Sequence, residues 1–225
     1  MEQELFTDKL QSLKNQSLSK MVGEKLELMI LSGQIQPGER INESNLSATL
    51  QISRAPIREA LRQLAQFGMV EIRTGKGTYV RQVLLTEAVE LYEIRGVLDA
   101  LAAEQASQRA NEEGLASLAE LVEQMRGYAS KQASTEYFTT NLKFHHQIVQ
   151  LSGSTALADL YEMVFKKLSL FRQKTLSKPD RLERSLMQHE EIYAAISRRD
   201  AERAAILARS HVEEAKLVLL GTPIK

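Results

Sequence analysis

The sequence predicts a mainly α-helical protein of two parts: an N-terminal winged helix-turn-helix of three helices plus a β-hairpin, and an all-α antiparallel bundle of six helices. Two observations support this fold class. Apolar residues recur at helical spacing through most of the 225 residues, and they alternate with polar ones only around residues 70–80. Glycine, proline and small polar residues divide the helical segments into short pieces before residue 81 and longer ones after it.

These divisions define the expected domains. Residues 1–16 are polar without clear periodicity, which predicts a flexible N-terminal arm. The winged helix-turn-helix is expected over residues 17–81, with the helix-turn-helix itself at about residues 42–61. Residues 82–86 are expected to form a linker and residues 87–221 the helical domain.

Each helix of the first part has a start or stop signal. Apolar spacing from Ser17 predicts a helix that ends at Gly33, because glycine readily ends a helix. Asn42 and Ser53 are expected to cap the second and third helices, and Gly68 ends the third.

A change of period predicts the hairpin. Apolar and charged residues alternate over residues 70–73, a turn with two glycines follows at residues 74–77, and residues 78–80 form the returning strand. The hairpin after three helices predicts the wing.

The second part contains almost no strand signal. Apolar spacing predicts six helices, at about residues 86–110, 112–130, 134–152, 155–177, 180–199 and 200–220. Their breaks carry expected caps or breakers, namely Thr86, Asn111, Ser134, Gly153, Pro179 and Asp200.

Composition excludes several classes of protein. The chain has no cysteine, which excludes disulfide scaffolds, thiolate nucleophiles and cysteine-based zinc sites. No apolar run approaches the roughly 18 residues that cross a bilayer, and the N-terminus lacks a signal pattern, so we expect a cytoplasmic protein with no membrane partner.

Charge distribution points to a nucleic-acid partner despite a net charge of zero. The 29 basic residues balance the 29 acidic ones over the whole chain. Residues 40–81, however, contain seven basic and three acidic residues, a local charge of +4. A basic module of this kind suits the phosphate backbone of DNA.

The third predicted helix has the two faces that a DNA-reading helix needs. Its apolar residues bury one face, which leaves Ser53, Arg54, Arg58 and Arg62 free for phosphates or base edges. The alternative is a solvated basic face in which Arg62 pairs with Glu59.

Several motifs in this module resemble the DNA-binding domain of GntR-family bacterial transcription regulators. They are the segments at residues 37–41, 46–48, 52–61, 68–70 and 77–80. The resemblance implies a homodimer that inserts its recognition helices into the major groove of a palindromic operator, while the wing touches the minor groove. By position, the implied DNA-facing residues are Ser44, Ser53, Arg54, Ala55 and Arg58, with Thr74, Gly75 and Lys76 at the wing tip. Many relatives have arginine at the position of Ser44.

The histidines of the second part suggest a polar cluster. Asn141 and His145 lie four residues apart on one helix face, and His189 and His211 lie on two later helices. Antiparallel neighbours can bring the three imidazoles together, whereas His146 points about 100° away from His145 around the helix. Taken singly, such histidines are more often structural.

This part of the chain resembles the FCD effector domain of the FadR subfamily of GntR regulators. The resemblance rests on the segments at residues 90–98, 141–145, 152–153, 189–192 and 195–201 and on His211. It implies a divalent metal held by Asn141, His145, His189 and His211, with a small carboxylate effector beside it.

The position of Asn141 departs from the aspartate that this pattern usually carries. An amide oxygen can ligate but brings no charge, so we expect weaker metal binding and an anionic effector that supplies the missing charge. Zinc, nickel or manganese could occupy the site, or imidazoles and arginine could bind a carboxylate without metal. Arg95 and Arg172 are the candidates for carboxylate capture; the alternative for both is an interhelical ion pair.

These observations predict a DNA-binding repressor whose helical domain senses a metabolite. A metal-sensing regulator without an organic effector is the first alternative. The second is a three-histidine metalloenzyme, but no catalytic partner stands out and the DNA module would then have no role.

Overall fold

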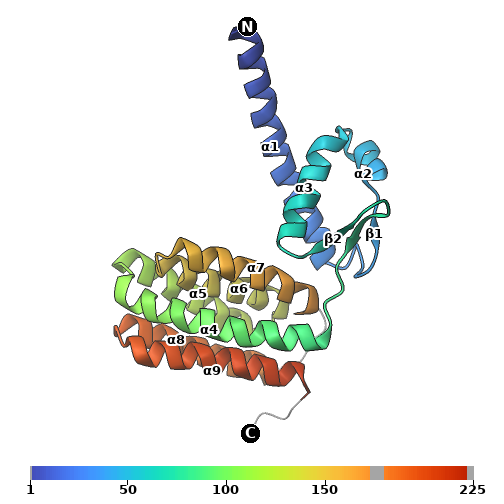
Figure 1. The fold of residues 1–225 in the computed structure, drawn as a ribbon. Helices are drawn as coiled ribbons and strands as arrows, with labels where there is room; N and C mark the ends of the chain where they lie inside the picture. Colours follow the sequence, from blue (N-terminus) through green and yellow to red (C-terminus); the bar gives the residue numbers. More distant parts are fainter. Residues whose placement is uncertain (1, 173–179, 222–225) are drawn as a thin grey trace. The chain divides into compact units, whose positions relative to one another are not determined.

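The computed structural model describes residues 2–172 and 180–221, with side chains for residues 17–171 and 182–221 (Figure 1). The chain divides into two compact units, with the main boundary between Leu84 and Leu85. The fold is mainly helical, as predicted.

The N-terminal unit is a winged helix-turn-helix. Its elements are α1 (Glu2–Leu31), β1 (Arg40–Ile41), α2 (Glu43–Leu50), α3 (Arg54–Gln66), β2 (Val70–Arg73) and β3 (Gly77–Val80). β3 lies in the middle of a three-stranded antiparallel sheet and pairs with β2 on one side and β1 on the other. The hairpin was predicted, but β1 was not, because two residues are too few to show a period.

The first helix begins earlier than predicted. α1 starts at Glu2, so residues 2–16 continue the helix rather than forming an irregular arm. This segment is rich in Glu, Lys, Leu and Gln, which favour a helix even without an apolar stripe.

The core of this unit joins α1, α3 and the sheet. Leu26 of α1 and Ile57 and Leu61 of α3 are almost completely buried. Gly23 lies where α1 crosses α3, and a Cβ atom there would stand 3.8 Å from Ala60. Packing along α1 therefore fixes α3, whose opposite face remains exposed.

The C-terminal unit is a helical bundle. Its helices are α4 (Leu85–Arg109), α5 (Glu112–Ser130), α6 (Ser134–Leu151), α7 (Thr155–Arg172), α8 (Asp180–Ser197) and α9 (Ala201–Leu219). α4 packs against α6, α8 and α9, and α5 packs against α6 and α8. Among the described residues, no helix combines the length and the apolar character needed to cross a membrane.

Two expected caps lie inside their helices. α4 begins at Leu85, so Thr86 lies inside the helix and the connection to the N-terminal unit is shorter than predicted. The N-cap of α6 is Ala133 rather than Ser134. Asn111 and Asp200 do cap their helices through side-chain oxygens. The predicted extension of α7 to residue 177 lies outside the described residues.

Candidate functional site

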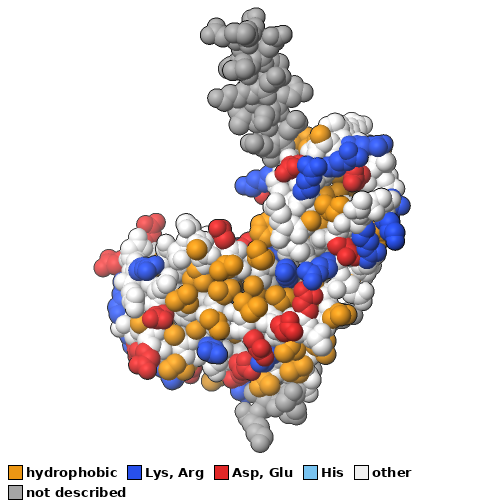
Figure 2. Space-filling view, in the orientation of Figure 1, with side chains coloured by type: hydrophobic (Ala, Val, Ile, Leu, Met, Phe, Trp, Pro, Cys, Tyr) orange, Lys and Arg blue, Asp and Glu red, His pale blue; other side chains and the backbone are white. Residues whose placement is uncertain are grey.

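The predicted DNA-facing residues all lie on the exposed surface of the N-terminal unit. They are Ser44, Ser53, Arg54, Ala55, Arg58, Arg62, Thr74, Gly75 and Lys76. Lysine and arginine side chains gather on the visible face of this unit (Figure 2). The residues therefore have the accessibility that contact with a duplex requires.

Two caps position the start of α2 and α3. The Asn42 carboxamide oxygen accepts hydrogen bonds from the backbone N–H groups of Ser44 and Asn45, each at 3.0 Å. Ser53 has extended backbone at the N-cap of α3, as predicted, but its side chain makes no capping hydrogen bond. The N-terminal turn of α3 thus keeps N–H groups that can donate to a phosphate.

Two of the arginines on α3 form ion pairs. Arg58 Nε lies 2.8 Å from Glu43 Oε2 on α2, and Arg62 lies 3.5 Å from Glu59. The second pair was the alternative considered for a solvated face; the first was not foreseen. Both arginine side chains remain more than half exposed, so each pair can open towards a phosphate.

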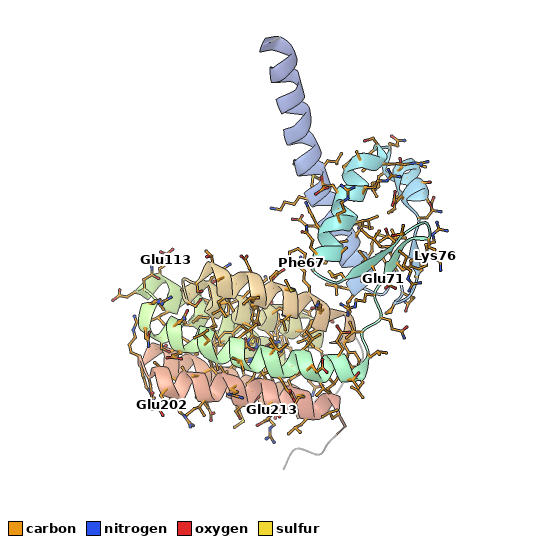
Figure 3. All side chains as sticks on the ribbon, viewed as in Figure 1. Phe67, Glu71, Lys76, Glu113, Glu202 and Glu213 are labelled. Atoms are coloured by element: carbon orange, nitrogen blue, oxygen red, sulfur yellow. The ribbon has the colours of Figure 1, made fainter. Side chains whose placement is uncertain are left out.

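The wing tip is a tight turn shaped by two glycines. Lys76 N–H donates to the Arg73 carbonyl at 2.9 Å, and Gly75 and Gly77 have φ of +71° and +105°. Lys76 lies at the tip of the wing and Glu71 on β2 (Figure 3). A Cβ atom on Gly77 would stand 3.0 Å from the end of the flexible Arg40 side chain, so the positive φ rather than the space favours glycine there. Arg40 of β1 is one of the seven basic residues counted over residues 40–81, although it is not among the predicted DNA-facing residues.

Three histidines from three helices meet inside the C-terminal unit. His145 of α6, His189 of α8 and His211 of α9 are all buried, and one ring nitrogen of each lies within 4.8 Å of the others. The Nε2 atoms of His145 and His189 are 3.3 Å apart. The structure thus brings together the three histidines that the resemblance implied.

The Nδ1 atom of each histidine faces a polar side chain. Tyr137 Oη lies 3.3 Å from His189 Nδ1, and Gln188 Oε1 lies 2.8 Å from His211 Nδ1. Asp99 Oδ1 lies 4.0 Å from His145 Nδ1. Partners of this kind orient ligand histidines in metal sites, because a hydrogen bond at Nδ1 leaves Nε2 deprotonated and available.

Asn141 supplies a fourth candidate ligand. It lies one turn before His145 on α6 and is buried, and its Oδ1 atom has no hydrogen-bond partner. Buried acceptors are normally satisfied, so this atom is available to a ligand.

The donor set fits a divalent metal. Nitrogens bound to one zinc ion at about 2.0–2.1 Å in tetrahedral geometry lie about 3.3–3.4 Å apart, close to the separation of the two Nε2 atoms. Burial, with a smaller contribution from the charge of Arg95, lowers the pKa of His189 to about 3. His189 is therefore neutral at physiological pH, the form that ligates. A direct His145–His189 hydrogen bond is the other interpretation of the short contact.

Arg95 lies beside this cluster and is completely buried. Its Nε atom is 3.0 Å from Asp99 Oδ2 on the same helix, so the pair is intrahelical rather than interhelical. Burial alone would lower the Arg95 pKa, but the charge of Asp99, followed by Tyr161 and Tyr92, raises it above its ordinary value. The side chain of Arg172, the other candidate for carboxylate capture, lies outside the described residues.

A small pocket lies beside His211 of the cluster. It has a volume of about 30 Å³ and is lined by His211 and by residues of α8 and α9, among them Arg184, Gln188 and Glu214. This volume holds one or two water molecules. This pocket is therefore too small for a metabolite as it stands.

His146 takes no part in the cluster. Its ring packs edge-on against Tyr161 and Phe165, with centroids 5.5 and 4.7 Å away, and it lies 3.8 Å from Glu162. Burial lowers the pKa of His146, although Glu162 opposes the shift.

The polar partners of the histidines were missed from the sequence, although two have a readable signal. Asp99 follows Arg95 by four residues, and Tyr137 precedes Asn141 by four on the face that carries His145. Gln188 has no such signal, because its partner lies on another helix.

A winged helix-turn-helix joined to a helical domain with a buried polar cluster defines a class of protein: a DNA-binding transcription regulator. The comparisons with known proteins agree. Residues 18–80 match bacterial regulatory proteins of the gntR family, and residues 90–214 match the FCD domain. The chain belongs to the GntR family and carries an FCD domain; its relatives are regulators, not enzymes.

Individual relatives support the same assignment. The HTH-type transcriptional regulator YdhC of Bacillus subtilis (strain 168) is 32% identical over 80% of this chain and 81% of its own length. The HTH-type transcriptional repressor RspR of Escherichia coli (strain K12) is 24% identical over 80% of this chain and 79% of its own. Among solved structures, E. coli McbR/YncC has the same fold, with a TM-score of 0.77 at 22% identity over 91% of this chain and 97% of its own.

Proposed function

We propose that this GntR regulator is a homodimeric repressor of the FadR subfamily whose FCD domain binds a divalent metal and, beside it, a small carboxylate. The observation that carries the proposal is a group of three buried histidines that each offer a ring nitrogen within 4.8 Å of the others, with protein side chains facing their Nδ1 atoms. His145, His189, His211 and Asn141 would hold the metal. When bound, the metal supplies a positive charge that attracts a carboxylate.

The DNA-facing set supports sequence-specific binding. Arg54 and Arg58 can pair bidentately with guanine or clamp phosphates, whereas Lys76 at the wing tip contributes sequence-independent charge. A homodimer would present two such surfaces to a palindrome. Binding to chromosomal DNA places the protein in the cytoplasm.

The helix α4 can link the two functions. It begins at Leu85, directly after the short connection from the DNA-binding unit, and it also carries Arg95 and Asp99 beside the histidine cluster. A ligand that moves α8 and α9 acts on helices packed against α4. Couplings of this kind are typically worth about 1–3 kcal/mol.

A metal-sensing regulator without an organic effector is the second candidate. The water-sized pocket at His211 favours it, because a metal ion fits there without a large movement of α8 and α9. The DNA proposal itself does not depend on which ligand acts.

One experiment tests both functions. An operator selected from random duplexes is titrated with the protein alone, with Zn²⁺, and with Zn²⁺ plus short carboxylates, for the wild type and for His189→Ala with His211→Ala. We expect salt-dependent, sequence-specific binding that changes on ligand addition only in the wild type. An operator affinity that does not depend on salt would reject the DNA assignment. A double variant that responds to the ligands as the wild type does would reject the histidine site.

A further inference from the structure

Two buried side chains of opposite chemical kind beside the histidine cluster have polar atoms that the protein does not fully satisfy. The Asn141 Oδ1 atom is an acceptor without a donor. The Arg95 side chain is only 1% exposed and interacts with Asp99 and Tyr161, but its Nη1 and Nη2 atoms make no hydrogen bond of regular geometry. An unsatisfied acceptor suits a cation and unsatisfied guanidinium donors suit an anion, so the site is prepared for both.

Charge counting leads to the same conclusion. Arg95 and Asp99 cancel each other in their buried pair, and the imidazoles of the cluster and the Asn141 amide are neutral ligands. A divalent ion at these ligands would leave a charge of about +2 uncompensated in a buried site. Buried charge of this kind is strongly disfavoured unless an opposite charge accompanies it.

Resting on the metal and carboxylate function proposed above, we propose that Asn141 makes metal binding conditional on the carboxylate, so that ion and anion bind as a pair. An aspartate at position 141 would give the protein its own negative charge, and the ion could then be held permanently. With asparagine, the anion must supply that charge, and the Arg95 donors provide it with a second partner. The metal would then be part of the signal rather than a fixed component of the protein.

The test compares Zn²⁺ affinity with and without succinate in the wild type, two site variants and one control variant. Competition with a chromophoric chelator gives the dissociation constant of Zn²⁺ for the wild type, Asn141→Asp and His189→Ala at neutral pH and constant ionic strength. Chloride at the same ionic strength serves as the control anion. Asn45→Asp makes the same charge change on the exposed surface of α2 and serves as the control variant.

We expect saturating succinate to tighten Zn²⁺ binding by the wild type and by Asn45→Asp roughly 10- to 100-fold, the range of ordinary coupling between sites. Asn141→Asp should bind Zn²⁺ tightly without succinate and respond less than about threefold, because its charge is already present. Circular dichroism checks that each variant is folded.

The outcomes separate this inference from the function on which it rests. Zn²⁺ binding by His189→Ala equal to the wild type would overturn the metal site itself. A wild type that binds Zn²⁺ tightly through His189 but without any effect of succinate would overturn the coupling alone. The coupling would also be overturned by an equal effect of chloride, or by an Asn141→Asp variant as dependent on succinate as the wild type.

Discussion

Replacing Asp99 by asparagine should destabilise the C-terminal unit strongly, because it leaves the Arg95 charge buried without its counterion. The two side chains are 1% and 4% exposed and lie 3.0 Å apart on consecutive turns of α4. The asparagine side chain has nearly the same size as the aspartate, so the substitution leaves no cavity; it removes the charge and turns one acceptor oxygen into a donor. The guanidinium cannot respond by losing its proton, because arginine stays protonated at any accessible pH.

The burial of both side chains determines how much unfolding free energy Asp99→Asn should remove. Removing one partner of a buried ion pair costs about 3–5 kcal/mol. The free energy of unfolding of a domain is about 5–15 kcal/mol, so Asp99→Asn should remove a large part of it. Replacing both partners with apolar residues, as in Arg95→Met with Asp99→Leu, should change stability by less than about 2 kcal/mol or increase it, because no charge then stays buried.

Urea unfolding followed by far-UV circular dichroism, in the presence of EDTA, measures these differences. Glu190→Gln is the control, because it breaks an ion pair with Arg126 that is exposed on the surface of the same unit. We expect its unfolding midpoint to match that of the wild type. If Asp99→Asn behaved like Glu190→Gln, Arg95 would have to be solvated in the native state, and the reasoning from burial would be refuted.

Three further predictions concern the two units separately. Arg58→Ala should weaken operator binding by about 1–3 kcal/mol and lower the discrimination among DNA sequences. Lys76→Ala should weaken binding to all duplexes alike and reduce the slope of log affinity against log salt concentration by about one. Filter binding over a salt series distinguishes the two effects. Leu61→Ala, at a residue 1% exposed, should destabilise the N-terminal unit by about 2–5 kcal/mol in chemical unfolding, and a smaller loss would mean that the site collapses around the cavity. His189 has a folded-state pKa of about 3 against an ordinary value of 6.5, so the unfolded chain binds its proton first as the pH falls. The stability that neutral His189 contributes is complete above its unfolded-state pKa. It should decline by up to about 1.4 kcal/mol per pH unit as the pH falls from that pKa to the folded-state pKa. In the metal-free protein, His189→Gln should remove this dependence of the unfolding free energy on pH.

Much of the fold could be predicted because it depends on local periodicity. The six helices of the C-terminal unit and the hairpin follow from apolar spacing, and Asn42, Asn111 and Asp200 from the chemistry of helix caps. β1 could not be predicted in this way. It exists because β3 offers a free edge to Arg40 and Ile41, which is a tertiary interaction.

The candidate site shows where a sequence stops being sufficient. Asn141 and His145 share a face of α6 because four residues make about one helical turn, and no knowledge of the fold is needed to place them together. The 3.3 Å separation of His145 and His189 depends instead on how α6 and α8 pack, with Phe144 lying edge-on to the His189 ring at 5.0 Å between centroids. Spacing along one helix therefore predicts which residues can meet, whereas packing between helices decides the distances on which ligand chemistry depends.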